Sequence, residues 1–449
     1  MSSSIPNECL SMILELFDPK DLRSCILVDR LWFEISVRFL WIKIYNHRTF
    51  LACLPIESKR MLRENGITFR PPTSNPLLFN YVKFIKEINE KTILLGYPKI
   101  LQQQFSANQK MLIAQESFKL IMKHASLKTL SVQNGVPFLE PNVPYITFPG
   151  ADVCLQKLCE FFGDSSIKSE YCSRLADFCK GIQKFNLQLD EDVNEGLDKL
   201  ISVQRNLKDL EILFNKRCTN FGPPLMNLAN SLIKLNINGC LYCPNFSFIN
   251  SFTKLRELTI SLSMDHENLK PLQDVTLPQL KILSFQYARL PRDYLSKFLE
   301  NNGRNLDELS CDYSLNLDVA KFCPNLKILK SIFSKEDDLK AILNNCQELK
   351  TLEVHCCELF LDESKILVNL AKFTPRNLSE LIITKSSDDN NNEKLFSNLL
   401  EDLSWGEEQH TPISIIIRGD KLNIKEQNKQ IIENYISLGH IKSYKLAIT

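Results

Sequence analysis

Four stretches, LKDLEI (207–212), LIKLNI (232–237), LRELTI (255–260) and LKILSF (280–285), share the pattern L-x-x-L-x-(I/L/V/F) and decide the fold of this chain. The starts of the clear copies are Leu127, Ile182, Leu207, Leu232, Leu255, Leu280, Leu306, Leu326, Leu349 and Leu378. A weaker copy, LQKLCE, begins at Leu155. Successive copies start 20 to 29 residues apart, so one structural unit repeats along most of the chain.

The period and the leucine spacing are those of leucine-rich repeats. Small or turn-forming residues stand eight positions after each start, where a strand must end and the chain must turn. They are Gly135, Gly163, Asp190, Asn215, Cys240, Ser263, Ala288, Ser314, Ser334, Cys357 and Ser386. Helix-like segments such as DDLKAILNNCQE precede many strands. The sequence therefore predicts an α/β solenoid, a leucine-rich-repeat horseshoe with a parallel sheet on the concave side and helices on the convex side.

Three parts can be drawn along the chain, covering residues 1–46, 47–120 and 121–449. Residues 47 to 126 show no copy of the repeat. Their amphipathic stretches predict a helical linker that caps the apolar end of the first repeat, because an uncapped solenoid exposes its core. At the other end, PISIIIRGD and IKSYKLAIT predict terminal strands that form the C-terminal cap.

Residues 1–46 predict three short helices. Pro6 suits a first helical position, and the Asp18-Pro19 pair suits an N-cap followed by proline. The third helix lies in LVDRLWFEISVRFLW (27–41). Apolar residues cover much of each helix, yet about 40 residues bury only a modest core by themselves. The surplus apolar surface predicts an interface.

This segment resembles the F-box, the module that docks substrate receptors onto the Skp adaptor of SCF ubiquitin ligases. The matching residues are Ile5-Pro6, Glu8, Leu10, Ile13-Leu14, Phe17, Asp21-Leu22, Leu27-Val28, Arg30, Trp32 and Leu40-Trp41. Ile5 stands where the family usually has leucine, and Asp29 where it often has cysteine. The resemblance implies an adaptor-binding set, of which some members hold the helices together instead. The set is Pro6, Leu10, Ile13, Leu14, Leu22, Val28 and Trp32.

A target protein is expected on the concave face. In each repeat strand the fourth and sixth residues point inward, so the third, fifth and seventh face the concave surface. The expected target-binding residues are Asp209, Glu211, Glu257, Ile282, Glu308, Asp312, Ile328, Glu353, Glu380 and Ile382. Basic residues are few at these third, fifth and seventh positions, which form columns across the stacked repeats. They are Lys234 and Lys330 from Leu207 onward, and Lys157 and Lys184 before it. A mostly acidic face dotted with isoleucines, including Ile332, predicts a target segment that carries Lys or Arg beside apolar anchors. The alternative is that mixed charges only keep the sheet soluble.

Other motifs have simpler explanations. Cys240-x-x-Cys243 lacks a second ligand pair at zinc spacing, and His355-Cys356-Cys357 ends a repeat strand. Arg418-Gly419-Asp420 follows a strand and predicts a tight turn. There is no phosphate-binding glycine loop and no hydrolase or kinase motif. The sequence predicts no catalytic residue, no metal site and no cofactor, so we expect a chain that is not an enzyme.

The balance of charge argues against polyanionic partners. The 54 basic and 53 acidic residues give a net charge of +1, so we expect neither nucleic acid nor membrane as a partner. Neither a signal peptide nor a spanning segment is expected. The 15 cysteines then indicate reduced thiols and a location in the cytosol or nucleus.

The resemblance implies a substrate-recognition subunit of an SCF-type ubiquitin ligase. The F-box would bind the Skp adaptor, and through it a cullin, while the repeats would bind a protein substrate. One alternative is a repeat scaffold that acts outside a ubiquitin ligase. Another is an enzyme hidden in the segments without repeats.

Overall fold

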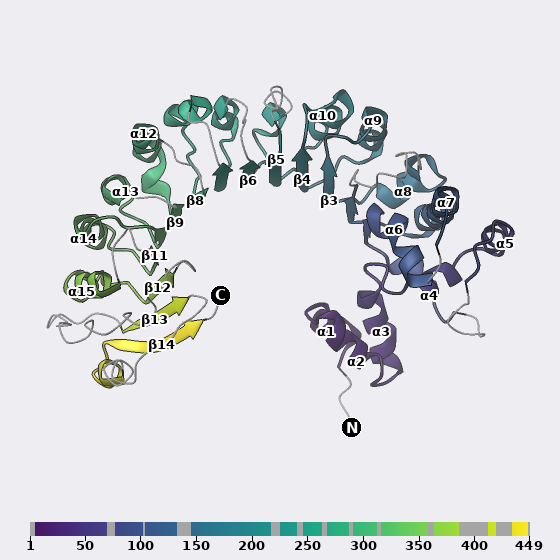
Figure 1. Cartoon of the computed structure of the whole chain (residues 1–449), viewed down its shortest axis with the longest axis horizontal. Coiled ribbons are helices and arrows are strands. Elements are labelled where there is room, and N and C mark those ends of the chain that lie inside the picture. The colour runs from purple at the N-terminus through teal and green to yellow at the C-terminus, as the bar shows by residue number, and fades with distance from the viewer. Residues whose placement is uncertain are drawn as a thin grey trace. The chain divides into compact units, whose positions relative to one another are not determined.

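A computed structural model describes twelve ranges of the chain, 5–69, 77–101, 104–132, 145–216, 225–239, 246–262, 267–286, 291–311, 316–356, 363–385, 412–418 and 433–447. It divides into two compact units, Met1–Leu210 and Glu211–Thr449. Strand order in the sheet follows the sequence from β1 to β14, and every pairing with a known register is parallel. In each unit the strands form one layer and the helices cover one face of it (Figure 1). The α/β solenoid predicted from the repeats is confirmed.

The first unit begins with the three predicted helices, α1 (Asn7–Glu15), α2 (Pro19–Cys25) and α3 (Arg30–Leu40). The Asp18 carboxylate caps α2 by accepting from the backbone N–H of Lys20 at 2.6 Å and of Asp21 at 2.9 Å. Asp29 caps α3 by accepting from the N–H of Trp32 at 2.9 Å. The acidic residue found where the F-box often has cysteine therefore satisfies an orphan donor of α3.

The segment expected to be a helical linker contains helices but also a strand. The helical elements here are α4 (His47–Ala52), α5 (Ile56–Glu64), η1 (Tyr81–Phe84), α6 (Glu90–Leu101) and α7 (Ala107–His124). Between them, β1 (Glu87–Asn89) pairs with β2 (Thr129–Ser131) through Ile88 and Leu130. The expectation that residues 47 to 126 lack a repeat strand was wrong. Ile85 and Ile88 replace the two leucines, and α6 begins at Glu90, the sixth position of this repeat.

The remaining elements of the first unit alternate as the repeats predict. They are η2 (Tyr145–Thr147), α8 (Ala151–Leu155), β3 (Glu160–Asp164), α9 (Ser169–Phe178), β4 (Lys184–Leu189), α10 (Glu195–Ser202) and the start of β5 (Asp209–Phe214). The weak copy lies three residues later than predicted. Leu158 and Phe161 are its buried first and fourth residues, and Phe161 pairs with Phe185. Lys157 therefore precedes the strand and does not belong to a concave column.

The second unit continues the same alternation. Its helical elements are η3 (Met226–Leu228), η4 (Phe246–Ser251), η5 (Glu267–Asp274), α12 (Arg292–Asn302), η6 (Gly303–Asn305), α13 (Asn316–Phe322), α14 (Glu336–Asn345) and α15 (Glu363–Phe373). Its strands are β6 (Lys234–Gly239), β7 (Glu257–Leu262), β8 (Ile282–Gln286), β9 (Glu308–Cys311), β10 (Ile328–Ser331), β11 (Thr351–Cys356), β12 (Glu380–Lys385), β13 (Ile413–Arg418) and β14 (Ile441–Ala447). The two predicted terminal strands are β13 and β14.

A recurring pair of backbone hydrogen bonds joins successive repeats. The carbonyl of the second repeat residue accepts two N–H groups from the next repeat, as Asp307 does from Lys327 at 2.8 Å and Ile328 at 3.0 Å. The same arrangement starts at the end of α3, where the Ile42 carbonyl accepts from Lys86 at 2.8 Å and Glu87 at 3.0 Å. The three N-terminal helices are thus hydrogen-bonded to the first strand.

Aromatic side chains cover part of α3. Trp41 is buried and packs on Tyr81, with ring centroids 4.7 Å apart, and Phe33 packs on Phe79 at 5.7 Å. Part of the surplus apolar surface of α3 is therefore covered by the same chain.

A polar cluster lies inside the first unit. Tyr145 is 2% exposed, stacks on Phe118 and donates its hydroxyl hydrogen bond to Glu90. The Tyr145 and Tyr171 hydroxyls are 2.5 Å apart. Burial, assisted by the negative charge of Asp164, raises the pKa of Glu90 to about 7. Glu90 is therefore protonated in the folded chain at a pH where an unfolded chain would ionise it.

We expect the inward leucines to be intolerant of charge. Leu258 is fully buried at the fourth position of its repeat, so Leu258→Asp places an unpaired charge in the core. The free energy of unfolding, measured by urea denaturation, should fall by at least about 3 kcal/mol. Thr259→Asp, on the concave face one residue later, should cost less than about 1 kcal/mol. Equal losses would contradict the register.

The Glu90 cluster predicts a pH dependence of stability. Because the folded pKa exceeds the unfolded value, stability should fall as the pH rises from about 4.5 to about 7, by up to about 3 kcal/mol. Glu90→Gln removes the titration, so the stability difference between variant and parent should shift in favour of the variant over this range. Urea denaturation at pH 5 and pH 8 measures it. An unchanged difference would show that Glu90 titrates alike in both states.

Candidate functional site

The structure divides the expected adaptor-binding residues into two groups. Leu10, Leu14 and Leu22 are 1%, 0% and 4% exposed, so they form the core of the three helices. The accessible members are Pro6, Ile13 and Val28, together with the half-buried Trp32. Truncating a core leucine would therefore disturb the fold of the helices themselves, which sequence spacing could not distinguish from the loss of a contact.

Sequence reasoning missed the most exposed apolar side chains of this region. Leu16 is 86% exposed, Leu27 84% and Met12 69%. With Ile5, Ile13 and Val28 they form what we call the exposed apolar set, located on α1, beside its ends and after α2. The i, i+4 spacing of Met12 and Leu16 was available as a signal. Six large apolar side chains in water on so small a module are typical of a protein-binding surface.

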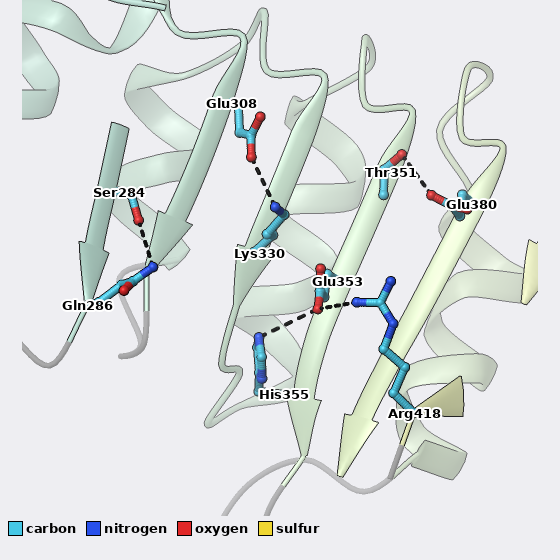
Figure 2. Close-up of polar contacts among 9 residues, drawn as sticks. All are labelled: Ser284, Gln286, Glu308, Lys330, Thr351, Glu353, His355, Glu380 and Arg418. Carbon is cyan, nitrogen blue, oxygen red and sulfur yellow. Dashed lines mark hydrogen bonds and ion pairs between the residues drawn. The ribbon is translucent and has the colours of Figure 1, made fainter. Parts of the chain in front are cut away.

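The concave face carries charges that pair across neighbouring strands. In the second unit, Lys234 pairs with Glu257 and Lys330 with Glu308, each at 3.1 Å. Figure 2 shows the second pair, between β9 and β10. In the first unit, Lys184 lies 3.6 Å from Asp209. The lysines that looked sparse in the sequence stand one strand away from carboxylates, so they neutralise much of the acidic character.

Glu353 on β11 is the centre of a denser network. It is 8% exposed and accepts from Nη1 of Arg418 at 3.2 Å and from Oγ1 of Thr384 at 3.4 Å. Nε2 of His355 lies 3.9 Å from its carboxylate. Arg418 reaches Glu353 from β13, two strands away, as Figure 2 shows. Glu353 therefore serves the structure of the sheet more than it offers a free charge.

Ile382 also differs from its expected exposure. It pairs in register with Glu353 and is 6% exposed, so it is nearly closed to a partner. Ile282, Ile328 and Ile332 remain half-buried and accessible.

Small polar groups fill part of the remaining concave face. Ser284 accepts from the Gln286 amide at 3.4 Å, and the Thr351 hydroxyl donates to Glu380 at 3.4 Å (Figure 2). Glu211 is half-buried on β5, and Asp312 lies outside the described residues. Paired charges, hydroxyls and isoleucines thus make up the described part of this face.

The remaining motifs lie largely among residues that the structure does not describe. Cys240, Cys243, Cys357 and the Gly419-Asp420 step lie outside the described residues. Within the described ranges, no group of three or more His, Cys, Asp and Glu side chains could hold a metal ion. Among the helices that the structure describes, none combines the length and apolarity needed to cross a membrane.

Comparison with known proteins identifies the N-terminal module. Residues 2–47 match the F-box-like family. The chain thus carries an F-box-like domain followed by a leucine-rich-repeat solenoid. No curated protein matches the chain.

Three solved structures illustrate the similarity. The chain resembles the one in the crystal structure of the Rad7 and Elc1 complex in yeast, at 14% identity over 86% of this chain and 96% of that one, with a TM-score of 0.32. The leucine-rich-repeat ectodomain of the Arabidopsis thaliana membrane receptor kinase GASSHO1/SCHENGEN3 is 14% identical over 74% of this chain and 44% of that one, with a TM-score of 0.31. A leucine-rich-repeat protein of Leptospira interrogans is 14% identical over 73% of this chain and 91% of that one, with a TM-score of 0.33.

The network around Glu353 predicts an unequal cost of removing its partners. Arg418→Ala leaves a buried carboxylate without its guanidinium, so the free energy of unfolding should fall by about 1–3 kcal/mol. Lys330→Ala breaks a more exposed pair and should cost less than about 1 kcal/mol. Urea denaturation of both variants checks this. If the two losses were the same, Glu353 would not depend on Arg418.

Proposed function

We propose that this chain is the substrate-recognition subunit of an SCF-type ubiquitin ligase. The F-box-like domain binds a Skp-type adaptor, and through it a cullin, while the repeats bind a target protein. The observation that carries the proposal is the exposed apolar set on the F-box-like domain. These side chains gain a dry environment only when a partner covers them.

Adaptor binding would use the exposed apolar set together with Pro6 and Trp32. Burying Leu16 and Leu27 alone supplies a large favourable term, since each side chain contributes about 1.5–3 kcal/mol when it leaves water. The core residues Leu10, Leu14 and Leu22 hold the helices that present this set. Hydrogen bonds from β1 to the Ile42 carbonyl connect the domain directly to the first repeat.

Target binding would use the concave face of the second unit. Ile282, Ile328 and Ile332 supply apolar contacts, and Glu257 and Glu308 supply charge. Because both carboxylates are already paired with lysines, a target must offer both signs of charge to exchange these pairs without loss. The expected target segment, with Lys or Arg beside apolar anchors, would therefore also carry acidic residues.

The chain would act by positioning. Holding target and ubiquitin-charged enzyme in one assembly raises their effective concentration, while other subunits supply the chemistry. We place this activity in the cytosol or nucleus. Burial raises the pKa of Cys172 and of Cys179 to about 12, which keeps both thiols protonated and unreactive.

The second candidate is a leucine-rich-repeat scaffold that acts outside a ubiquitin ligase. The extensive paired charge of the concave face is equally suited to that role. Co-purification of the adaptor together with a cullin supports the ligase subunit. An adaptor complex that never contains a cullin supports the scaffold.

The exposed apolar set gives the test of adaptor binding. The double variant Leu16→Glu/Leu27→Glu places charge on exposed positions, so the fold should persist while capture of the purified Skp adaptor weakens at least about tenfold. Leu438→Glu, at an exposed leucine of the second unit, is the matched control and should bind the adaptor normally. Unfolding temperature, followed by circular dichroism, verifies that the variants fold. Undiminished adaptor capture by the folded double variant would refute the proposal.

A further inference from the structure

The second residue of each repeat forms a row at the edge of the sheet. Its carbonyl accepts the two N–H groups from the next repeat, so the row advances one strand at a time, with a spacing of about 4.8 Å. In the first unit this row contains Lys86 and Lys128, and the Lys86 carbonyl accepts from Lys128 N at 2.7 Å. Lys157 lies two residues before the next member, Cys159.

These lysines stand close enough to repel one another. Burial, together with the charges of Lys128 and Lys157, lowers the pKa of Lys86. Nearby, burial and the charges of Lys123 and Lys83 lower the pKa of His124. We call these six residues the basic patch: Lys83, Lys86, Lys123, His124, Lys128 and Lys157.

The carboxylates of the described residues leave the basic patch uncompensated. Among the described residues, none of its six members has a carboxylate within 4.0 Å. The acidic side chains at the third position of the same repeats interact with residues outside the patch. Glu87 pairs with Lys43 at 2.8 Å, and Glu160 accepts from the Thr129 hydroxyl at 3.2 Å. The lysines of the patch thus carry positive charge that no described carboxylate offsets, in a chain whose net charge is only +1.

The second unit shows how the same row can be neutralised. There Asp307 stands between two lysines, with its carboxylate 3.6 Å from Lys281 and 2.9 Å from Lys327. The two lysines lower the pKa of Asp307 mainly through the Lys327 hydrogen bond. An acidic residue between two basic ones is therefore compatible with this row, and its absence in the first unit leaves a site for an external anion.

Helix α7 explains only part of the patch. Lys123 lies in its last turn, where positive charge is stabilised by the helix dipole. Lys86, Lys128 and Lys157 have no such compensation. Their mutual repulsion would be relieved by a bound anion.

We propose that the basic patch binds an acidic segment of a partner protein, at a site separate from the exposed apolar set and the concave face. Lysines spread over successive strands suit carboxylates distributed along a polypeptide. The patch contains no arginine fork, the group best matched to bidentate phosphate recognition. Glu87 and Glu160 beside it limit the positive area, which disfavours a long phosphodiester backbone.

The test uses the full chain and a fluorescein-labelled peptide of alternating glutamate and serine, with fluorescence anisotropy as the readout. The parent should bind the peptide, and added salt should weaken binding. Lys86→Gln/Lys128→Gln/Lys157→Gln should bind at least about tenfold more weakly. The control Lys281→Gln/Lys327→Gln/Lys350→Gln changes the net charge equally and should bind like the parent.

Several outcomes would overturn the proposal. They are an absence of peptide binding by the parent, equal losses in the two triple variants, and tighter binding of a labelled single-stranded oligonucleotide than of the peptide. Adaptor capture, measured on the same proteins, should be unchanged by either triple variant. Because the peptide assay contains no adaptor, its failure would not be confused with failure of the proposed ligase role.

Discussion

The pair of hydrogen bonds accepted by the second carbonyl of most described repeats is the constraint on which the rest of the structure depends. One oxygen with two lone pairs satisfies two donors of the next strand, so each repeat fixes the start of its neighbour. Once the start is fixed, the alternation of a strand sends the fourth and sixth residues inward and the third and fifth outward. The core leucines and the concave face are therefore two consequences of one register. The same carbonyl geometry at Ile42 brings the F-box-like domain into the repeat system.

The leucine pattern predicted the strand register of most repeats, including β4, where Ile182 and Phe185 take the first and fourth positions. Leu210, Leu235, Leu258, Leu283 and Leu352 are all fully buried, in agreement with the predicted register. The pattern failed at β1 and β3. Ile85 and Ile88 hold β1, and Phe161 holds β3, because the core requires apolar volume at these positions and not leucine in particular. In β3 the nearby pair Leu155 and Leu158 drew the predicted register three residues away. The division into three sequence segments stays a prediction.

The candidate surfaces were predictable in composition but not in accessibility. Sequence spacing shows that α1 is apolar on more than one side, yet only packing decides that Leu14 is covered and Leu16 is not. On the sheet, a list of concave residues gives their net charge but not their partners. Lys330 and Glu308 lie 22 residues apart in the sequence and 3.1 Å apart in space. Arg418, which the sequence showed only as part of a turn motif, reaches across β12 to Glu353.

Charge in a stacked-repeat protein has to be judged column by column. Residues at the same repeat position become neighbours on adjacent strands. Like charges therefore accumulate along such a column unless a residue of opposite charge stands between them. The second unit inserts Asp307 between two lysines, and the third-position column alternates Lys234 with Glu257. Such alternation lets the sheet carry many charged side chains at little electrostatic cost, because each carboxylate lies near an ammonium group. The row from Lys86 to Lys128 breaks this rule. Unrelieved repulsion lowers stability in the free chain and is recovered only when an anion binds, which is why an uncompensated column is a stronger indication of a partner than the total charge of the protein.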